Sequence, residues 1–332
     1  MDNLAAIFET FTTKKIFVIG DVMIDSYMWG KTERISPEAP VPVVSITEKE
    51  NRMGGAANVG LNIKAMGAEA VLCAVIGNDN YGSIFRELLT KRNMSDRGIV
   101  EAPNRPTTVK TRVIASSQHL LRVNEEISSP IDSALEKLFT DHTNKLIENE
   151  MPDAIVFEDY DKGNITPSVI KNIVEKAVSL NIPVLVDPKK RNFFDYKNVT
   201  LFKPNFKELV EGMKITISKN DSEEVIEAAN NLRKELNAKY VMVTLSENGV
   251  LLTDGIQTFA MPAQKREIAD VSGAGDTVIS VLACCMAGNL DAQKSTVIAN
   301  IAGGLVCEKV GVVPIEKTQL LKETTNYFQQ NS

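Results

Sequence analysis

Short runs of β-branched residues alternate with helical patterns along this chain, and the alternation limits the folds open to it. The clearest helical pattern covers 166–180, with Thr166 as a cap residue, Pro167 at the first helical position and apolar residues at helical spacing. It lies between apolar runs at 154–157 and 184–186, as a crossover helix lies between parallel strands. The sequence therefore predicts an α/β fold in which helices cover a mostly parallel sheet.

Two segments depart from this alternation. Residues 36–46 carry three prolines among valines, and 107–123 is rich in Val, Thr and Ile, so both predict exposed or edge strands. Neither a Pro/Gly/Ser-rich linker nor an internal repeat divides the sequence. We expect one domain over 1–332, with a small inserted β lid whose strands fall within about 27–50 and 107–123.

Charge and composition exclude several classes of function. The 37 Lys and Arg residues are outnumbered by 43 Asp and Glu, and the net charge of -6 has the wrong sign for a general nucleic-acid binder. The longest apolar run, 278–287, is about half of what a bilayer-spanning helix needs. The first residues, 1–15, lack the basic start of a secretory signal, and the four cysteines lack C-x-x-C spacing. We expect a cytoplasmic protein without a membrane segment or a nucleic-acid partner.

The most informative motif is Asp-Val-Ser-Gly-Ala-Gly-Asp-Thr at 270–277, directly before the apolar helical run. Small residues at a helix start leave backbone N–H groups uncovered, and these groups with the helix dipole form a site for an anion such as phosphate. Asp276 presents a carboxylate beside that anion, an arrangement suited to phosphoryl transfer. In the alternative interpretation, Ser272 only caps the helix and Asp276 is a first-turn acid favoured by the dipole.

A second group of candidate residues lies near the N-terminus. Asp21 and Asp25 follow the first predicted strand, and the Gly-Gly-Ala-Ala-Asn motif at 54–58 opens a predicted helix over 56–66. Ligands of open α/β sheets bind beyond the carboxyl ends of the strands, and carboxylates with the Asn58 amide suit sugar hydroxyls. Alternatively, the glycine pair only makes a tight turn and the aspartates lie in a solvated loop.

Other motifs are incomplete. Gly-Lys-Thr at 30–32 is similar to the end of a P-loop, but Asp25 stands where that motif needs glycine. The Gly-Ala-Gly of 273–275 lacks the third glycine of a dinucleotide fingerprint, which disfavours a nicotinamide oxidoreductase. His119 and His142 have no Ser or Cys partner pattern and are expected to be structural or surface residues.

Together, the motifs resemble those of the ribokinase-like (PfkB) family of carbohydrate kinases over about residues 14–320. Within the family they most resemble kinases of D-glycero-β-D-manno-heptose 7-phosphate, which serve lipopolysaccharide precursor synthesis. Four segments carry this resemblance: Arg-Ile-Ser-Pro-Glu-Ala-Pro-Val-Pro-Val at 34–43, Asp-Tyr-Asp-Lys-Gly at 159–163, Asp-Pro-Lys at 187–189, and the motif at 270–277. The resemblance implies a ribokinase-like three-layer fold with a central, mostly parallel sheet and an inserted β lid that often pairs two subunits into a homodimer. It also implies ATP-dependent phosphorylation of the anomeric hydroxyl, giving the 1,7-bisphosphate.

The resemblance further implies roles in catalysis and nucleotide binding. Asp276 is the expected base, and the amides of Gly273, Ala274 and Gly275 are expected to stabilise the transferring phosphoryl group. The residues expected near ATP are Asn205, Phe206, Lys207, Glu208, Thr244, Ser246 and Gly249. Asn205 and Glu208 are expected to organise Mg²⁺ through water, because this ion prefers oxygen ligands and retains its own waters. Asp270 is expected to order the loop, with a monovalent cation.

For the acceptor, the resemblance implies contacts from two sets of residues. The hydroxyl-binding candidates are Asp21, Asp25, Gly54, Gly55 and Asn58. An acceptor that already carries phosphate requires cations, and the candidates are Lys110, Arg112, Arg122 and Lys189. Alternatively, Lys110 and Arg112 simply form the solvated face of a lid strand.

The chain also departs from the heptose kinases. Glu158 and Asp161 stand where Ser and Ala are usual, and Val312 and Val313 replace residues with hydroxyl groups. Because the chain ends at Ser332, we expect no nucleotidyltransferase domain of the kind that follows the kinase in some relatives. A kinase for another sugar, sugar phosphate or nucleoside is the alternative function. A catalytically silent sugar-phosphate sensor is a non-enzyme alternative, against which the intact Gly-Ala-Gly-Asp argues.

Overall fold

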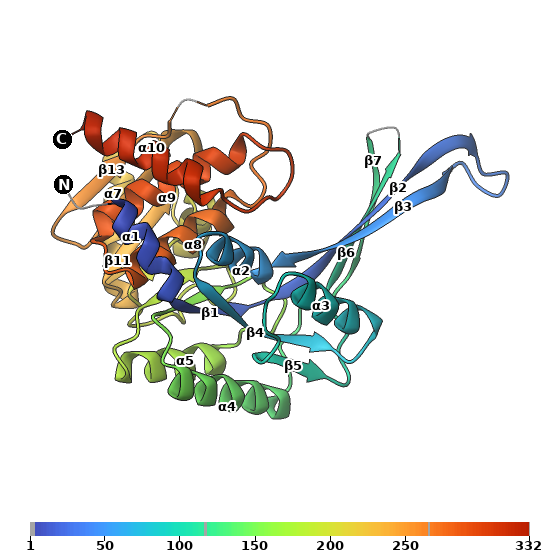
Figure 1. The fold of residues 1–332 in the computed structure, drawn as a ribbon, viewed down its shortest axis with the longest axis horizontal. Coiled ribbons are helices and arrows are strands. Elements are labelled where there is room, and N and C mark those ends of the chain that lie inside the picture. Colours follow the sequence, from blue (N-terminus) through green and yellow to red (C-terminus); the bar gives the residue numbers. More distant parts are fainter. Residues whose placement is uncertain (1–3, 116–117, 265, 332) are drawn as a thin grey trace.

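The computed structural model describes residues 4–115, 118–264 and 266–331. Within these residues, nine strands form a sheet in the order β13-β12-β11-β10-β9-β8-β1-β4-β5, covered by helices on both faces (Figure 1). The strands from β11 to β5 are parallel, whereas β12 and β13 are antiparallel at one edge. Their bounds are β1 (Lys15–Gly20), β4 (Glu69–Gly77), β5 (Ile99–Ala102), β8 (Ala154–Glu158), β9 (Val184–Asp187), β10 (Leu201–Phe202), β11 (Tyr240–Thr244), β12 (Val250–Thr253) and β13 (Thr258–Met261). The α/β class and the mostly parallel sheet predicted from the sequence are confirmed.

The central strands are apolar on both faces because helices cover both sides of the sheet. In β1, Ile16 and Val18 belong to one hydrophobic core, whereas Phe17 and Ile19 belong to the core on the opposite face. A half-exposed sheet would alternate apolar and polar residues, but a parallel sheet buried on both sides gives near-continuous hydrophobic runs. This is why short β-branched runs in the sequence located the strands.

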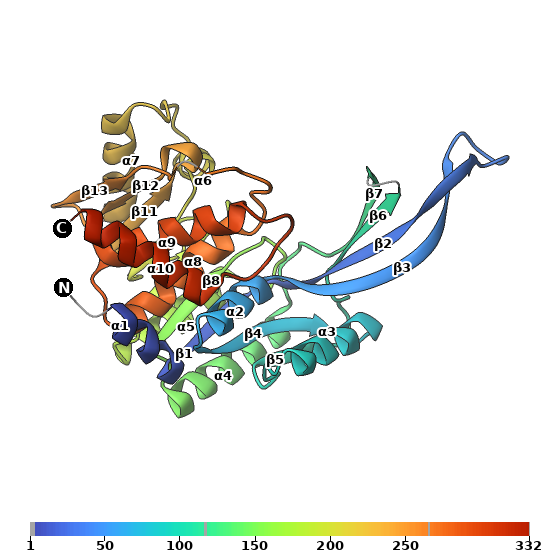
Figure 2. The same ribbon diagram turned by 45° about the horizontal axis from the view of Figure 1, so that its top comes forward.

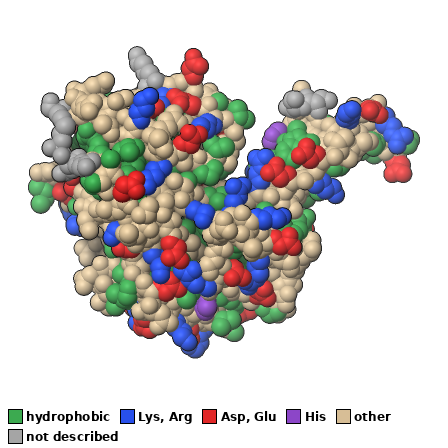
Figure 3. All heavy atoms as spheres, in the orientation of Figure 1, with side chains coloured by type: hydrophobic (Ala, Val, Ile, Leu, Met, Phe, Trp, Pro, Cys, Tyr) green, Lys and Arg blue, Asp and Glu red, His purple; other side chains and the backbone are tan. Residues whose placement is uncertain are grey.

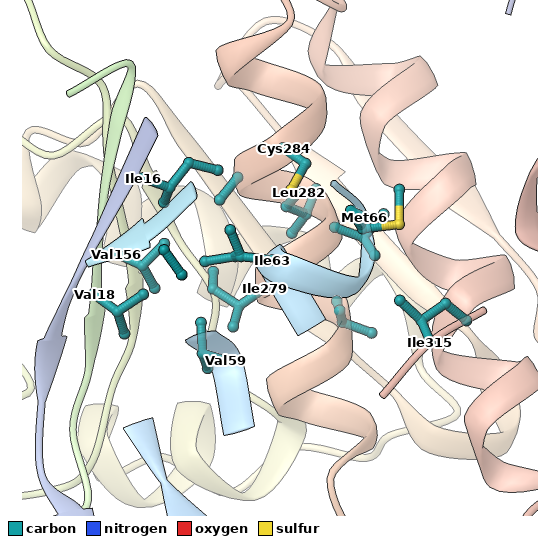
Figure 4. Close-up of a cluster of buried hydrophobic side chains, with 14 of the residues drawn as sticks. Ile16, Val18, Val59, Ile63, Met66, Val156, Ile279, Leu282, Cys284 and Ile315 are labelled. Carbon is teal, nitrogen blue, oxygen red and sulfur yellow. The ribbon is translucent and has the colours of Figure 1, made fainter. Parts of the chain in front are cut away.

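The first helical layer packs against the Ile16 face of the sheet. Figure 4 shows its centre, where Val59 and Ile63 of one helix meet Ile279 of another above the strand residue Val18. The helices of this layer are α1 (Leu4–Thr10), α2 (Ala56–Ala65), α3 (Asn80–Lys91), α8 (Ala274–Ala287), α9 (Ala292–Cys307) and α10 (Lys317–Gln330). In the described part of the chain, no helix has both the length and the apolar character that crossing a membrane would need.

The second helical layer covers the other face. It contains α4 (Ser133–Glu150), α5 (Pro167–Ser179), α6 (Phe206–Met213) and α7 (Ser222–Leu236). The predicted start of α5 is confirmed, because the Thr166 side chain accepts a hydrogen bond from the backbone of Val169 and Pro167 occupies the first helical position.

A second sheet projects from the body as an arm, which is made of β2 (Val22–Ile35), β3 (Pro42–Gly55), β6 (Val109–Ala115) and β7 (Gln118–Glu125) (Figure 2). β2 begins before the expected segment of 27–50, and β3 ends after it. The expectation of a strand over 36–46 is wrong for 36–41, which form the turn at the tip of the arm. Pro42 begins β3, where a missing N–H group is tolerated.

The arm is attached at the carboxyl ends of the large sheet. β1 leads into β2 through Asp21, and β3 leads into α2 through Gly55. The backbone of Gly55 has a positive φ of +62°. A side chain on Gly55 would place a Cβ atom 2.3 Å from the Asp21 carbonyl oxygen, so the close approach of the two strands requires glycine. Residues of the arm and of the strand ends therefore meet at one edge of the body.

Candidate active site

Asp276 lies in the first turn of α8 and is only 7% exposed. Its Oδ1 accepts a 3.0 Å hydrogen bond from the Tyr160 hydroxyl, and its Oδ2 accepts a 3.2 Å hydrogen bond from the Asn58 amide. Burial, and next the nearby Asp187 carboxylate, raise the pKa of Asp276 to about 6, although the two hydrogen bonds oppose the shift. Such a group is ionised at neutral pH but accepts a proton readily, which suits a general base.

The backbone at the start of α8 is open. Gly273 is the N-cap residue with φ +79°, so the alternative in which Ser272 caps this helix is wrong. Gly273 and Ala274 are half-buried and Gly275 is exposed, and the first N–H groups of a helix have no partners within it. A Cβ atom on Gly275 would lie 3.6 Å from the Asp187 carboxylate, with no closer contact. An anion can therefore approach this turn beside Asp276.

Asp270 orders the loop before α8. Its carboxylate accepts hydrogen bonds from the backbone N–H groups of Ser272, at 2.9 Å, and Gly311, at 3.0 Å, and backbone hydrogen bonding lowers its pKa. The N–H of Asp270 also donates to the Cys307 carbonyl at the end of α9. Across the described residues, no cluster of three or more His, Cys, Asp or Glu side chains could hold a metal ion. The geometry thus gives Asp270 a loop-ordering position, and the monovalent cation stays a prediction.

Three neighbouring strands end in charged residues beneath α8. Glu158 ends β8, Asp187 ends β9 and Lys203 follows β10. Asp187 and Lys203 form a 2.7 Å ion pair in which both side chains are less than a tenth exposed. Because like-directed parallel strands end at the same edge, this buried pair lies under the anion-binding turn.

The expected nucleotide residues gather at the next strand ends. Asn205 caps α6 and forms a reciprocal capping box with Glu208, while Phe206 is half-buried and Lys207 is exposed. Thr244, at the end of β11, pairs with Asn205 through a β-bridge. The turn after β11 contains Ser246 at φ +53° and Gly249 at φ +87°, where a Cβ atom would lie 2.0 Å from the Met261 carbonyl oxygen.

The contacts of Glu208 show whether this residue fits a Mg²⁺ site. Its Oε1 accepts a 2.5 Å hydrogen bond from Lys189, and its Oε2 accepts a 2.9 Å hydrogen bond from the Asn205 backbone. With both oxygens engaged, this carboxylate fits an ion that keeps its waters better than an ion bound directly. Lys189 also lies 5.7 Å from the centre of the Tyr160 ring, as Lys110 does, so its expected pairing with the acceptor phosphate stays a prediction.

The acceptor candidates separate into residues that line a pocket and a residue that is sealed off from it. Asp25 and Asn58 line a pocket together with Arg52 and Arg92. Asp21, by contrast, is fully buried, and its carboxylate accepts hydrogen bonds from the backbone N–H groups of residues 160, 162 and 164. The expectation that Asp21 contacts the sugar is therefore wrong in this geometry, because its carboxylate fixes the loop after β8.

Glycines let the arm approach this pocket closely. A Cβ atom on Gly54 would lie 2.2 Å from the Asp25 carboxylate, so only glycine leaves room for that side chain. Arg112 of β6 donates a 2.6 Å hydrogen bond to Asp25 and stacks over the ring of Tyr27. The arm thus fixes the orientation of Asp25 from the neighbouring strand.

Cationic side chains gather where the arm meets the body, as Figure 3 shows. Lys110 lies 5.7 Å from the centre of the Tyr160 ring, and burial, then the charge of Lys162, lower its pKa, with a smaller contribution from Arg122. Lys110 and Arg112 are half-buried and face other site residues, so they do not form only a solvated strand face. An anion between these cations would relieve their mutual repulsion.

Sequence reasoning assigned no role to several residues of this site. Tyr160 and Lys162 lie within the motif at 159–163, which was a usable signal, but the Tyr160 contact with Asp276 spans 116 residues. Lys203 lies two residues before Asn205, outside the motifs of the sequence. Two helices and a strand, α2, β4 and α3, lie between Arg52 and Arg92, and nothing in the sequence shows that they share a pocket.

A three-layer α/β body, a projecting β arm and an anion-binding helix start beside a buried carboxylate together define a ribokinase-like sugar kinase. The family profile of the pfkB family carbohydrate kinases matches residues 13–319. The chain therefore belongs to the pfkB family of carbohydrate kinases and is an enzyme, as the sequence motifs predicted.

Curated relatives and solved structures agree with this assignment. The chain is 35% identical over 317 residues to the bifunctional protein HldE of Trichlorobacter lovleyi, covering 95% of this chain and 64% of that protein. It is 38% identical over 308 residues to the bifunctional protein HldE of Helicobacter hepaticus, covering 93% and 63%. The chain thus spans less than two thirds of the length of these relatives.

Among solved structures, phosphofructokinase-2 from Escherichia coli in complex with potassium superposes with a TM-score of 0.76 at 18% identity, covering 95% of this chain and 99% of that chain. Ribokinase of Arabidopsis thaliana, complexed with ribose and ATP, gives a TM-score of 0.71 at 16% identity, covering 93% and 99%. These structures share the fold of this chain.

Proposed function

We propose that this kinase transfers the γ-phosphoryl group of ATP to the anomeric hydroxyl of D-glycero-β-D-manno-heptose 7-phosphate, giving the 1,7-bisphosphate. The observation that carries the proposal is the position of Asp276, a buried carboxylate between the open backbone of 273–275 and Asn58 of the acceptor pocket. The choice of heptose rests on the signatures at 34–43 and 159–163 and on the cations at the base of the arm.

In this proposal, Asp276 takes the proton from the acceptor hydroxyl. The hydroxyl oxygen forms a bond to the γ-phosphorus, the bond to the bridging oxygen of ADP breaks, and ADP leaves with that electron pair. The N–H groups of Gly273, Ala274 and Gly275 stabilise the charge on the transferring group. Tyr160 and Asn58 hold the carboxylate in one orientation by their hydrogen bonds.

The nucleotide lies along the ends of β10 and β11. Residues of the segments 205–208 and 244–249 contact it, as the family motifs imply. Asn205 and Glu208 would hold Mg²⁺ through water, since their oxygens already accept hydrogen bonds from the chain. The ion would neutralise phosphate charge. Asp270 keeps the loop before α8 in place, with a monovalent cation nearby.

The acceptor lies between the arm and α2. Asp25, Asn58 and the backbone of Gly54 and Gly55 bind its hydroxyl groups. Its phosphate is bound by the basic group at the base of the arm, which consists of Lys110, Arg112, Arg122 and Lys162.

The exposed edge of the arm supports the proposal that this kinase forms a homodimer. All eight residues of β7 are exposed, including Leu120, Leu121 and Val123, which are 39%, 58% and 43% exposed. An exposed edge strand with apolar side chains favours pairing with a second copy.

The function is tested by measuring ADP release with a panel of acceptors. The panel contains heptose 7-phosphate, the same heptose without phosphate, fructose 6-phosphate, ribose and adenosine. We expect the highest kcat/KM with heptose 7-phosphate. A higher kcat/KM with another acceptor would show that this acceptor, and not the heptose, is the substrate. If none of the acceptors gives an ATP-dependent product, the silent sugar-phosphate sensor is favoured.

A further inference from the structure

Glu158 is a buried acid directly beside the proposed base, and the proposed reaction gives it no role. It ends β8, is 1% exposed and pairs in register with Gly20 of β1 and Asp187 of β9. Within the described part of the chain, its Oε2 has no hydrogen-bond partner. An ionised carboxylate that is buried with an oxygen left without a donor is unfavourable, so protonation of that group would relieve the cost.

The positive charges of Lys203 and Lys189 offset the charge of Glu158 only in part. Asp187 of β9 and Asp276 of α8 add negative charge next to Glu158. The two lysines that face it already have carboxylate partners, because Lys203 pairs with Asp187 and Lys189 pairs with Glu208. The hydroxyl of Tyr160, from the loop after β8, donates its hydrogen bond to Asp276 and not to Glu158.

Glu158 and Asp276 therefore differ in the hydrogen bonds that their carboxyl groups accept. Asp276 accepts hydrogen bonds from Asn58 and Tyr160, which stabilise its ionised form, whereas Oε2 of Glu158 accepts none. Because the two groups repel each other when both are charged, ionisation of one favours the protonated form of the other.

We propose that Glu158 is a positioning residue, held as a neutral carboxylic acid so that Asp276 is the member of the pair that ionises and serves as base. The proposal rests on the role of Asp276 in the proposed function. Burial, and then the charges of Asp187 and Asp276, raise the pKa of Glu158 well above its usual value, in agreement with the geometry. Loss of its proton at alkaline pH would put a second negative charge beside the incoming phosphoryl group.

Equilibrium unfolding in urea tests the protonated state without any substrate. In the unfolded chain, Glu158 is ionised above a pH of about 4.3. If the folded protein keeps the proton, its stability falls as pH rises from that value towards the raised pKa. The unfolding constant of the wild type then increases relative to that of Glu158→Gln, by up to about tenfold for each pH unit between pH 6.5 and 8.5.

Glu87→Gln, the same change at an exposed position, is the matched control, and its ratio to the wild type should not change with pH. A ratio for Glu158→Gln that is also constant over this range would overturn the proposal. If Glu158→Gln does not fold, Glu158→Met, which likewise carries no proton, replaces it.

The pH profile of kcat/KM tests the consequence for catalysis. We expect the wild type to lose activity on the alkaline side as Glu158 ionises, and Glu158→Gln to retain activity there. A merely structural role would change the height of the profile and leave its alkaline limb in place. If no acceptor is phosphorylated, the proposed function is contradicted. The unfolding experiment would still decide whether Glu158 is protonated in the folded protein.

Discussion

The Tyr160 hydroxyl donates a 3.0 Å hydrogen bond to Oδ1 of Asp276, joining the loop after β8 to the first turn of α8. Asn58 holds the other carboxylate oxygen from α2. Three segments that are distant in the sequence thus fix one carboxylate at the edge of the acceptor pocket. Pre-organisation of this kind would place the proposed base without further reorganisation during the reaction.

Asp276→Asn should lower kcat by roughly 10²- to 10⁴-fold, because the amide cannot accept the proton from the acceptor hydroxyl. The asparagine side chain has nearly the same shape, so affinity for the acceptor, measured by calorimetry without ATP, should change little. Near-normal turnover of this variant would exclude Asp276 as the base.

The pH dependence should follow the ionisation of Asp276. With a pKa raised to about 6, kcat/KM should be level just above that pH and fall by about tenfold per unit below it. Tyr160→Phe removes a hydrogen bond that stabilises the ionised form, so the acid limb should move up by about one pH unit. Tyr196→Phe is the control, because that hydroxyl donates to Asp159 instead. An unmoved limb in Tyr160→Phe would argue against the coupling.

Alanine at two glycines should separate catalysis from stability. Gly275→Ala places its Cβ atom no closer than 3.6 Å to its neighbours, so the fold should tolerate it while the methyl group obstructs the anion. We expect kcat to fall by about tenfold or more with an unchanged melting temperature. Gly273→Ala forces alanine to φ +79° and should lower stability by about 1–2 kcal/mol. Full activity of Gly275→Ala would place the anion elsewhere.

The buried pair of Lys203 and Asp187 should be strongly coupled. Lys203→Met leaves Asp187 buried and uncompensated, and should lower the free energy of unfolding by about 3–5 kcal/mol. Adding Asp187→Asn should recover much of this loss, as measured by urea unfolding. Additive effects of the two changes would show that the pair does not act as a unit.

Lys110→Met should raise KM for a phosphorylated acceptor by about tenfold or more, because it removes a partly desolvated cation from the proposed phosphate site. KM for ATP and for the unphosphorylated sugar should change little. Lys31→Met provides a matched control, since Lys31 is exposed on the same arm. An equal rise in KM for both sugars would assign Lys110 to a general role in packing.

Local sequence patterns were enough to predict the strands and helices that form the layers of the body. The apolar runs located strands such as β1 and β8 because both faces of the sheet are buried. The prolines of 36–41 were less informative, because proline suits both an edge strand and a turn. Spacing alone did not reveal that these residues form the tip of a long hairpin.

The sequence by itself determined the fold class, and it predicted the open helix start at 273–275 with Asp276 beside it, because these depend on short-range patterning and on helix-start chemistry. Only the tertiary structure decided how the charged groups pair. It showed that the Asp21 carboxylate accepts hydrogen bonds from the loop after β8 and that Lys189 donates to Glu208. It also brought Tyr160 to Asp276 and Glu158 to the same buried edge. The physical reason is that burial and pairing depend on which strand ends lie side by side, and sequence distance does not encode that neighbourhood.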